Sequence, residues 1–229
     1  MDKVTIVIPV KDEEVGLQFL IEDFERSNII QTYVIKFIFV IDERTSDDSK
    51  KIASKLSDII IDQSGSTGKA DAVRKAMGRL KSGNQEFVVF LDADGSYSFK
   101  DVKAILSELE KGVDVSSGSR FLGNDGKPEG MSRLHTFGNH FLSKISSLRN
   151  RRKITDLCTG LWGFSNESIE KLDIKSTGFD LEAEIAGLVR KNHLSHSEVP
   201  VSWSQRKGGE SKLRSLKDGF VILMRILRT

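Results

Sequence analysis

Two aspartates separated by a single alanine are the residues whose placement most plainly suggests chemistry. Asp92 and Asp94 follow the apolar run FVVFL (87–91). Carboxylates this close repel each other unless a positive charge lies between them. Mg²⁺ prefers oxygen ligands and is commonly held by one or two carboxylates together with substrate phosphates. The pair therefore predicts a site for Mg²⁺ or Mn²⁺, in preference to the alternative that both residues cap the next helix.

Acidic residues also follow two other apolar runs. VTIVI (4–8) leads into Lys11, Asp12 and Glu13, and FIFVI (37–41) leads into Asp42 and Glu43. If the runs are parallel strands, their carboxyl ends share one edge of a sheet, which is where open α/β sheets bind ligands. We therefore expect a cation or a polyhydroxylated ligand at this edge. For Asp12 and Glu13, capping of the following helix is an equally good interpretation.

The surrounding pattern predicts the elements that would position these residues. Nearly continuous β-branched and aromatic runs are typical of parallel strands covered on both faces. Apolar residues between them recur at helical spacing, which predicts an α/β fold with a Rossmann-like, mostly parallel sheet flanked by helices on both faces. The predicted strands are 4–8, 37–41, 58–61 and 87–91, and helices are predicted around 17–24, 70–80, 102–109, 134–148, 180–192 and 215–228, with a loop at 122–133. We expect one domain over 1–229.

Composition narrows the class of protein. The 229 residues carry a net charge of only +2, which gives no support for a nucleic-acid-binding protein. The single cysteine, Cys158, allows no intramolecular disulfide. We find neither a signal peptide nor an apolar stretch of the roughly 20 residues that a membrane span needs. The expected setting is cytoplasmic.

Three other motifs are weak candidates for a site. GSTGK (65–69) lacks the upstream glycine of a phosphate-binding P-loop, and Ala70 follows its lysine where the motif needs Ser or Thr. His193 and His196 have no Cys or carboxylate at the spacing of zinc ligands. Cys158 has no evident histidine partner, so thiol catalysis is not expected.

The order of several short motifs matches a known family. They are IVIPVKDEE (6–14), VIDERTSDDS (40–49), GKADAVRKAM (68–77), FLDADGSYS (90–98), GSRF (118–121), ITDLCTGLWGF (154–164), GFDLEAEI (178–185) and VPVSW…RKGGESK (199–212). The chain resembles family 2 glycosyltransferases with the GT-A fold, and more narrowly those similar to dolichol-phosphate mannose synthase. The resemblance covers roughly residues 4 to 215.

The resemblance implies a donor site at the predicted sheet edge. Pro9, Asp12 and Glu14 would line the base and ribose of a nucleotide-sugar, and Asp42 would contact the uracil or guanine. The first motif departs from the family pattern, because it reads Lys-Asp-Glu where an aromatic residue and an asparagine are common. The second motif reads Glu-Arg where Asp-Gly is frequent, so the base contacts are the least specific part of the match.

The same resemblance implies the reacting centre. Lys69 and Asp71 would close over the nucleotide or sugar, while Asp92 and Asp94 would bridge the ribose and the metal-bound pyrophosphate. Asp156 would lie beside the reacting sugar, and Glu182 matches the acidic residue of the Gly-Phe-x-x-Glu segment. The residues expected to hold the donor pyrophosphate or an acceptor phosphate are Arg120, Arg133, Arg206 and Lys212.

The implied reaction is an inverting transfer of a hexose from a GDP- or UDP-linked donor, and the acceptor decides which groups it needs. A polyprenyl or dolichyl phosphate is already nucleophilic, since its second pKa lies near about 6, and requires cations rather than a base. The basic runs 149–153 and 206–212, and a basic amphipathic helix at 215–228 that could lie on a membrane surface, favour this acceptor. The alternative for that helix is packing on the sheet.

Other functions remain open at this point. A transferase acting on a hydroxyl of a glycan or small molecule would need a carboxylate base, for which Asp156 and Glu182 are the candidates. Nucleotidyltransferases of similar architecture carry a Gly-rich loop after the first strand, which is absent here. A non-catalytic nucleotide-sugar binding module should lack one carboxylate of the Asp-x-Asp pair, and both are present. The sequence carries no signal for an oligomeric state.

Overall fold

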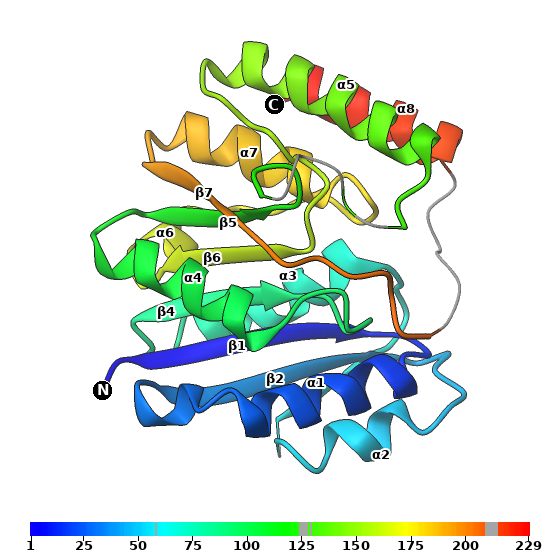
Figure 1. The fold of residues 1–229 in the computed structure, drawn as a ribbon, viewed down its shortest axis with the longest axis vertical. Helices are drawn as coiled ribbons and strands as arrows, with labels where there is room; N and C mark the ends of the chain where they lie inside the picture. The colour runs from blue at the N-terminus through cyan, green and yellow to red at the C-terminus, as the bar shows by residue number, and fades with distance from the viewer. Residues whose placement is uncertain (58, 124–127, 129, 209–214) are drawn as a thin grey trace.

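A sheet of seven strands lies at the centre of the computed structural model, which describes all residues except 58, 124–127, 129 and 209–214 (Figure 1). The order across the sheet is β3-β2-β1-β4-β6-β5-β7. The strands are β1 (Lys3–Val10), β2 (Val34–Asp42), β3 (Ile60–Gln63), β4 (Phe87–Leu91), β5 (Val115–Ser119), β6 (Leu161–Ser165) and β7 (His196–Pro200).

The four predicted strands form a continuous parallel half of this sheet. β1 pairs with β2 from Lys3 opposite Val34 to Val10 opposite Ile41, and β4 and β3 extend the sheet on either side. The strand interiors are buried on both faces, which explains their unbroken apolar sequences. The prediction of a mostly parallel α/β sheet is confirmed.

The other half of the sheet contains the strands that the sequence pattern does not predict. β6 is antiparallel to both β4 and β5, and β7 pairs with β5 in parallel. All five residues of β5, VSSGS, are buried although three of them are serines. The antiparallel β6 brings the turn before it, around Gly160, back to the carboxyl end of β4.

Helices cover both faces of the sheet. The helices α1 (Glu14–Arg26), α2 (Ser49–Ala53) and α4 (Phe99–Glu110) contribute apolar residues to one core cluster, while α3 (Lys69–Leu80), α6 (Asn166–Lys171) and α7 (Leu181–Lys191) contribute to the cluster on the opposite face. A short 3₁₀ helix, η1 (Ile29–Gln31), leads into β2. The predicted helices begin and end close to the expected positions, and in α1, α3, α4 and α7 the periodic apolar residues mark the buried face.

A third, outer layer consists of α5 (Arg133–Asn150) and α8 (Ser215–Arg228), which lie side by side (Figure 1). Ile222 and Ile226 of α8 are buried with residues of α5 and α7 in a small core cluster. Arg225 fixes this position by pairing with Asp180 at 2.7 Å and Glu184 at 3.4 Å. The terminal helix therefore packs on two helices rather than on the sheet. Within the described part of the chain, no helix has the length and apolarity that crossing a membrane requires.

Candidate active site

The Asp-x-Asp pair lies in the turn that follows β4, at the carboxyl edge of the parallel strands. The Asp92 amide donates to the Gly160 carbonyl at 3.2 Å, and the Ser96 amide donates to Asp94 Oδ1 at 3.0 Å. The Asp92 and Asp94 side chains keep 31% and 17% of their surface exposed. Backbone contacts thus fix the main chain at Asp92 and the carboxylate of Asp94, and both carboxylates remain accessible from outside.

Lys69 links one of these carboxylates to a residue far away in the sequence. Its Nζ lies 2.7 Å from Asp92 Oδ1 and 2.8 Å from Glu182 Oε1. Burial alone would lower the pKa of Lys69, but the two carboxylates outweigh it and raise that pKa above its ordinary value. Burial raises the pKa of Asp92, and Lys69 offsets this only in part because Asp94 and Glu182 add negative charge. The group therefore has a surplus of negative charge that a further cation would relieve.

Arg206 makes the corresponding contact to the second carboxylate. Its Nη2 lies 3.1 Å from Asp94 Oδ2 and 3.0 Å from Glu13 Oε1. Glu13 is buried at the start of α1, where its amide donates to the Ser49 hydroxyl at 2.8 Å. The site thus combines four carboxylates with two cations drawn from α1, α3, the β4 turn, α7 and the segment after β7.

Two glycines make the close approach of these segments possible. A Cβ atom at Gly160 would overlap the Asp92 carboxylate, and a Cβ atom at Gly16 would lie 2.7 Å from backbone atoms of Asp94. Glycine at these positions lets the turn before β6 and helix α1 contact the Asp-x-Asp turn directly. This close packing fixes the turn that carries Asp92 and Asp94, whose carboxylate oxygens are the kind of ligand that Mg²⁺ and Mn²⁺ prefer.

The two carboxylates fit a metal that takes its remaining ligands from phosphate and water. Among the residues that the structure describes, no cluster of three or more His, Cys, Asp or Glu side chains is placed to share a metal ion. Mg²⁺ is commonly bound by one or two carboxylates plus substrate phosphates rather than by an all-protein cage. Asp92 and Asp94 would hold such an ion.

Arg120 and Asp156 form a buried ion pair behind the turn at Gly160. Arg120 donates to both carboxylate oxygens, from Nε at 2.6 Å and from Nη2 at 2.7 Å, and its Nη2 also donates to the Cys158 carbonyl. Asn139 of α5 donates to Asp156 Oδ1 at 2.6 Å. Asp156 is 0% exposed, so it can influence a substrate only by positioning Arg120.

Asp42 lies at the end of β2 with its carboxylate already engaged. Arg44 donates to its two oxygens at 2.8 and 2.7 Å. This hydrogen bonding lowers the pKa of Asp42 below its ordinary value against the opposing effect of burial. Pro9 pairs with Val40 in the neighbouring strand, so Pro9 and Asp42 lie at adjacent strand ends, as the sequence predicts.

Asp12 and Glu14 hold the loop that follows β2. Asp12 Oδ1 accepts the Ser46 amide at 2.8 Å, and Glu14 Oε2 accepts the Asp48 amide at 3.1 Å. Asp12 adopts a left-handed backbone conformation with φ of 48°. The two carboxylates shape the loop at the carboxyl edge through these contacts. The N-cap of α1 is Glu13, which makes no side-chain capping hydrogen bond, and Asp12 contacts the loop instead, so the capping alternative for these two residues is wrong.

Asp71 is buried at the start of α3 and fastens the loop that precedes the helix. Its carboxylate accepts hydrogen bonds from Gln63, at 2.9 Å, and from Ser66, and it pairs with Arg74. Burial alone would raise the pKa of Asp71, but these contacts outweigh it and lower that pKa. Asp71 therefore positions the segment that carries Lys69.

The basic residues expected to hold a phosphate divide into separate groups. Arg133 begins α5 and is exposed, whereas Arg149 lies 16 residues further along the same helix, at a distance of about 24 Å. The two arginines are therefore too far apart to contact one phosphate together. Arg152 is also turned inward and donates to the Leu194 carbonyl at 3.3 Å. Lys212 lies outside the described residues.

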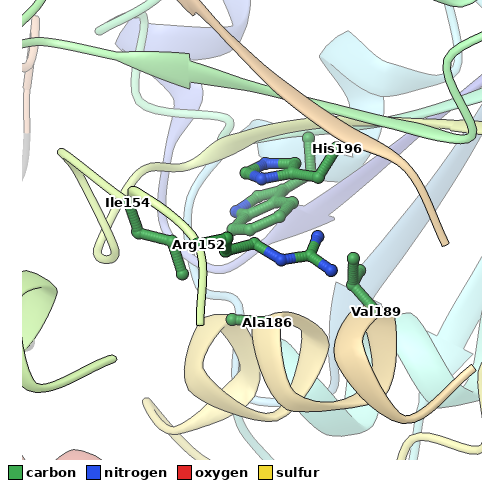
Figure 2. Close-up of a pocket in the computed structure, with 6 residues that line it drawn as sticks. Arg152, Ile154, Ala186, Val189 and His196 are labelled. Atoms are coloured by element: carbon green, nitrogen blue, oxygen red, sulfur yellow. The ribbon is translucent and has the colours of Figure 1, made fainter. Parts of the chain in front are cut away.

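A crevice under β7 is a second feature of the fold, and Figure 2 shows it. Arg152, His196 and residues of α7 line it, and His196 stacks on Trp162 at 5.7 Å. Its empty space of about 150 Å³ includes open solvent and is too small for a nucleotide. Burial and the nearby Arg152 lower the pKa of His196 to about 4, so this imidazole is neutral at physiological pH. Burial likewise raises the pKa of Cys158 to about 12.

The site also contains residues that the sequence patterns do not single out. Gly16, Asn139 and Gly160 all contact predicted site residues. Asn139 lies in α5 among apolar residues, with no local sign of its contact to Asp156. The two glycines are easier to identify from the sequence than Asn139, because each lies beside a predicted motif residue where a close backbone approach is expected.

The sequence matches one family model and several known proteins. The model of glycosyl transferase family 2 matches residues 5–173. The chain is 28% identical over 229 residues to "Glycosyltransferase AglJ" of Haloferax volcanii, covering 99% of this chain and 72% of that protein. It is 26% identical over 232 residues to "Dolichol-phosphate mannosyltransferase" of Pyrococcus furiosus, covering 99% of this chain but only 63% of the relative.

Solved structures show the same fold. Glucosyl-3-phosphoglycerate synthase from Mycobacterium tuberculosis, in complex with Mn²⁺, UDP and glucosyl-3-phosphoglycerate, matches with a TM-score of 0.73 at 15% sequence identity, covering 99% of this chain and 79% of that one. At this identity the likeness concerns the fold alone. The predicted GT-A fold is confirmed.

Proposed function

Because the chain belongs to glycosyl transferase family 2, we propose that it transfers a hexose from a GDP- or UDP-linked donor to a polyprenyl phosphate, with Mg²⁺ or Mn²⁺ at the donor diphosphate. The observation that carries this proposal is the accessible pair Asp92 and Asp94 at the carboxyl edge of the parallel strands. Open α/β sheets bind nucleotides at this edge. The relative named as a dolichol-phosphate mannosyltransferase supports the choice of acceptor.

The donor would lie across the ends of β1, β2 and β4. Pro9 and Asp42 would meet the base and ribose, and Asp92 and Asp94 would hold the metal beside the diphosphate. When bound, the metal supplies positive charge where negative charge develops as the nucleoside diphosphate leaves. Lys69 adds a fixed cation next to Asp92, on the side of the site formed by Glu182.

The acceptor would attack the anomeric carbon directly, with inversion. A phosphate monoester is an anion at neutral pH and needs no proton removed, so a base is dispensable. This agrees with the burial of Asp156, whose oxygens are both engaged by Arg120. Arg120 itself is held under the turn at Gly160, where its positive charge would act on the phosphate groups without leaving its partner.

The outer helical layer supports an acceptor that resides in a membrane. Large apolar side chains of α5 and α8 that face outward form what we name the apolar face: Leu134 at 59% exposure, Phe137 at 71%, Phe141 at 50%, Leu148 at 74%, Phe220 at 64%, Val221 at 41% and Leu227 at 53%. Exposed apolar groups gathered in this way mark interaction surfaces. We propose that the apolar face rests on an anionic lipid bilayer.

Charge complementarity favours a bilayer as the occupant of this face. The sequence of α5 contains no Asp or Glu, and Lys144 on α5 is exposed. Arg151 after α5, and Lys217 and Arg228 on α8, are exposed as well. Each basic group near an anionic membrane surface contributes about 1 kcal/mol. Basic residues around an apolar stripe are the pattern of helices that lie in the membrane interface.

The membrane proposal is tested with surface substitutions rather than by removing α8, because Ile222 and Ile226 of that helix belong to the core. Phe137→Ser combined with Leu148→Ser should abolish sedimentation with liposomes of anionic phospholipid and leave the unfolding midpoint unchanged. Ile30→Ser, at an exposed site on η1, is the matched control and should bind as the wild type does. Undiminished liposome binding by the double variant would contradict the proposal that the apolar face contacts the membrane.

The acceptor class is tested by donor turnover. Release of nucleoside diphosphate from a panel of GDP- and UDP-hexoses should rise when polyprenyl phosphate is added and should not rise with simple sugars. Robust transfer to a sugar hydroxyl, with no lipid product, would favour the hydroxyl-acceptor alternative. In that case Glu182→Gln should abolish transfer, since Glu182 has an exposed fraction of 12% and Asp156 has none.

A further inference from the structure

The segment after β7 crosses directly over the Asp-x-Asp turn; we name residues 203–208 the strap. The Lys207 amide donates to the Asp94 carbonyl and the Ser204 amide donates to the Ser96 carbonyl, both at 3.0 Å. At its far end, a Cβ atom at Gly208 would lie 2.9 Å from Val15 of α1. The backbone of the strap is therefore anchored on the same turn that presents the two carboxylates.

Arg206 is the side chain of the strap that enters the site. Its guanidinium pairs with Asp94 Oδ2 at 3.1 Å, while Asp94 Oδ1 accepts a hydrogen bond from the Ser96 amide. The Oδ2 atom is thus the oxygen that a metal would bind, and it is held by an arginine of the same chain. Lys69 occupies Asp92 Oδ1 in the same way, at 2.7 Å.

Arg206 and Lys69 differ in how readily they could leave. Both cations are held between two carboxylates, Lys69 by Asp92 and Glu182 and Arg206 by Asp94 and Glu13, but Lys69 begins helix α3. Arg206 belongs to a segment with no regular secondary structure, and its side chain is 23% exposed. A long arginine side chain can turn about its own rotatable bonds while the backbone contacts of the strap persist.

We infer that Arg206 is a positioning residue that exchanges with the metal: it neutralises Asp94 while the metal is absent, and it moves to the donor diphosphate when a divalent cation takes its place. The inference rests on the proposed metal role of Asp94. Arginine suits both positions, because its planar group pairs with carboxylate and with phosphate. The exchange keeps the charge near Asp94 balanced in both states.

The exchange has a measurable consequence for binding order. A divalent cation arriving alone must displace Arg206 from Asp94 and leaves the guanidinium only the contacts that it already makes, such as that to Glu13, so the cation binds weakly. A cation arriving with a nucleoside diphosphate supplies that partner. Metal and nucleotide should therefore strengthen each other's binding, and by the same factor in each direction.

The test uses Arg206→Met, with Lys207→Met as the matched control. Lys207 is the adjacent cation on the strap, and its Nζ lies over the Phe19 ring at 4.8 Å rather than on a carboxylate. Free Mn²⁺ is titrated and followed by electron paramagnetic resonance. Unit charges about 4 Å apart interact measurably even in water, so Arg206→Met should bind Mn²⁺ alone at least about fivefold more tightly than the wild type. Lys207→Met should change this affinity less than about twofold.

The second half of the test measures UDP and GDP at saturating Mn²⁺ by calorimetry. Loss of a charge-assisted contact should weaken binding of the preferred nucleotide to Arg206→Met by about tenfold or more. Arg206→Lys keeps the charge and should bind Mn²⁺ within about twofold of the wild type. The two affinities thus move in opposite directions in one variant, which a general loss of folding cannot produce.

Unchanged or weaker Mn²⁺ binding by Arg206→Met would overturn the inference, and so would an unchanged affinity for the nucleotide. Failure of the proposed function gives a different result: the wild type would then bind neither UDP nor GDP in a manner that depends on Mn²⁺. The acceptor does not enter either measurement, so a hydroxyl acceptor would leave the inference standing.

Discussion

Gly160→Ala is the smallest change that should disable the site while leaving every charged residue in place. A Cβ atom at this position would overlap Oδ2 of Asp92, and it would also lie 3.1 Å from the ring of Tyr97. The Tyr97 ring is buried, and its hydroxyl accepts a hydrogen bond from the residue 160 amide at 2.9 Å. The ring therefore cannot move away from the added Cβ atom. The Asp92 carboxylate must move instead.

The size of the effect follows from that displacement. Restoring van der Waals contact moves the carboxylate by about 1 Å, and a misplacement of this size can lower turnover by about 10²-fold. The movement also disturbs the pair between Asp92 and Lys69, whose atoms now lie 2.7 Å apart. We expect turnover of the nucleotide-sugar to fall by about two decades, while the free energy of unfolding falls by only about 1–3 kcal/mol, the usual cost of crowding a packed site.

The assay compares nucleoside diphosphate release with urea unfolding for the same preparations. Gly78→Ala is the matched control, because Gly78 lies in α3 and a Cβ atom there meets nothing within 4 Å. That variant should keep full turnover and gain about 0.5–1 kcal/mol of stability. Wild-type turnover in Gly160→Ala would refute the reasoning that the Asp92 position governs the reaction.

Two further predictions concern buried groups. Asp156→Asn removes the charge that balances Arg120 and should cost about 3 kcal/mol of unfolding free energy, measured in urea; a loss below about 1 kcal/mol would show that the pair is not the anchor described here. The pKa of His196 is lowered to about 4, below its ordinary value. The neutral imidazole therefore contributes fully to the free energy of unfolding above about pH 6.5. This contribution, about 3 kcal/mol in all, is lost as the pH falls toward 4. His196→Gln should flatten the fall of unfolding free energy across this range, whereas His193→Asn, at an exposed site, should leave it as steep as in the wild type; equal slopes in all three proteins would contradict the assignment.

The sequence predicts the parallel half of the sheet because those strands are buried on both faces and are apolar throughout. VTIVI, FIFVI and FVVFL are continuous apolar runs that a doubly covered strand requires. β5 gives no such signal, since its buried serines are tolerated only through contacts across the sheet, such as that of Ser117 with His196 at 2.9 Å. Local sequence cannot report a partner that lies 79 residues away.

The candidate site likewise has one part that the sequence predicts and another part that it does not. The Asp-x-Asp pair is readable because like charges at a strand end demand a cation. The contact between Lys69 and Glu182 joins residues 113 apart, and the contact between Arg206 and Glu13 joins residues 193 apart, so neither pairing follows from spacing. The outward direction of the α5 apolar stripe is also hidden from the sequence, because the same periodicity would serve a buried helix.

The most direct test of the central claim is a crystal structure of the protein with Mn²⁺ and the nucleoside diphosphate that it releases, recorded at a wavelength where manganese scatters anomalously. We predict one manganese peak at Asp94, between that carboxylate and the diphosphate, with the nucleotide across the carboxyl ends of β1, β2 and β4. A nucleotide bound on another face of the sheet, or manganese bound away from Asp92 and Asp94, would contradict it.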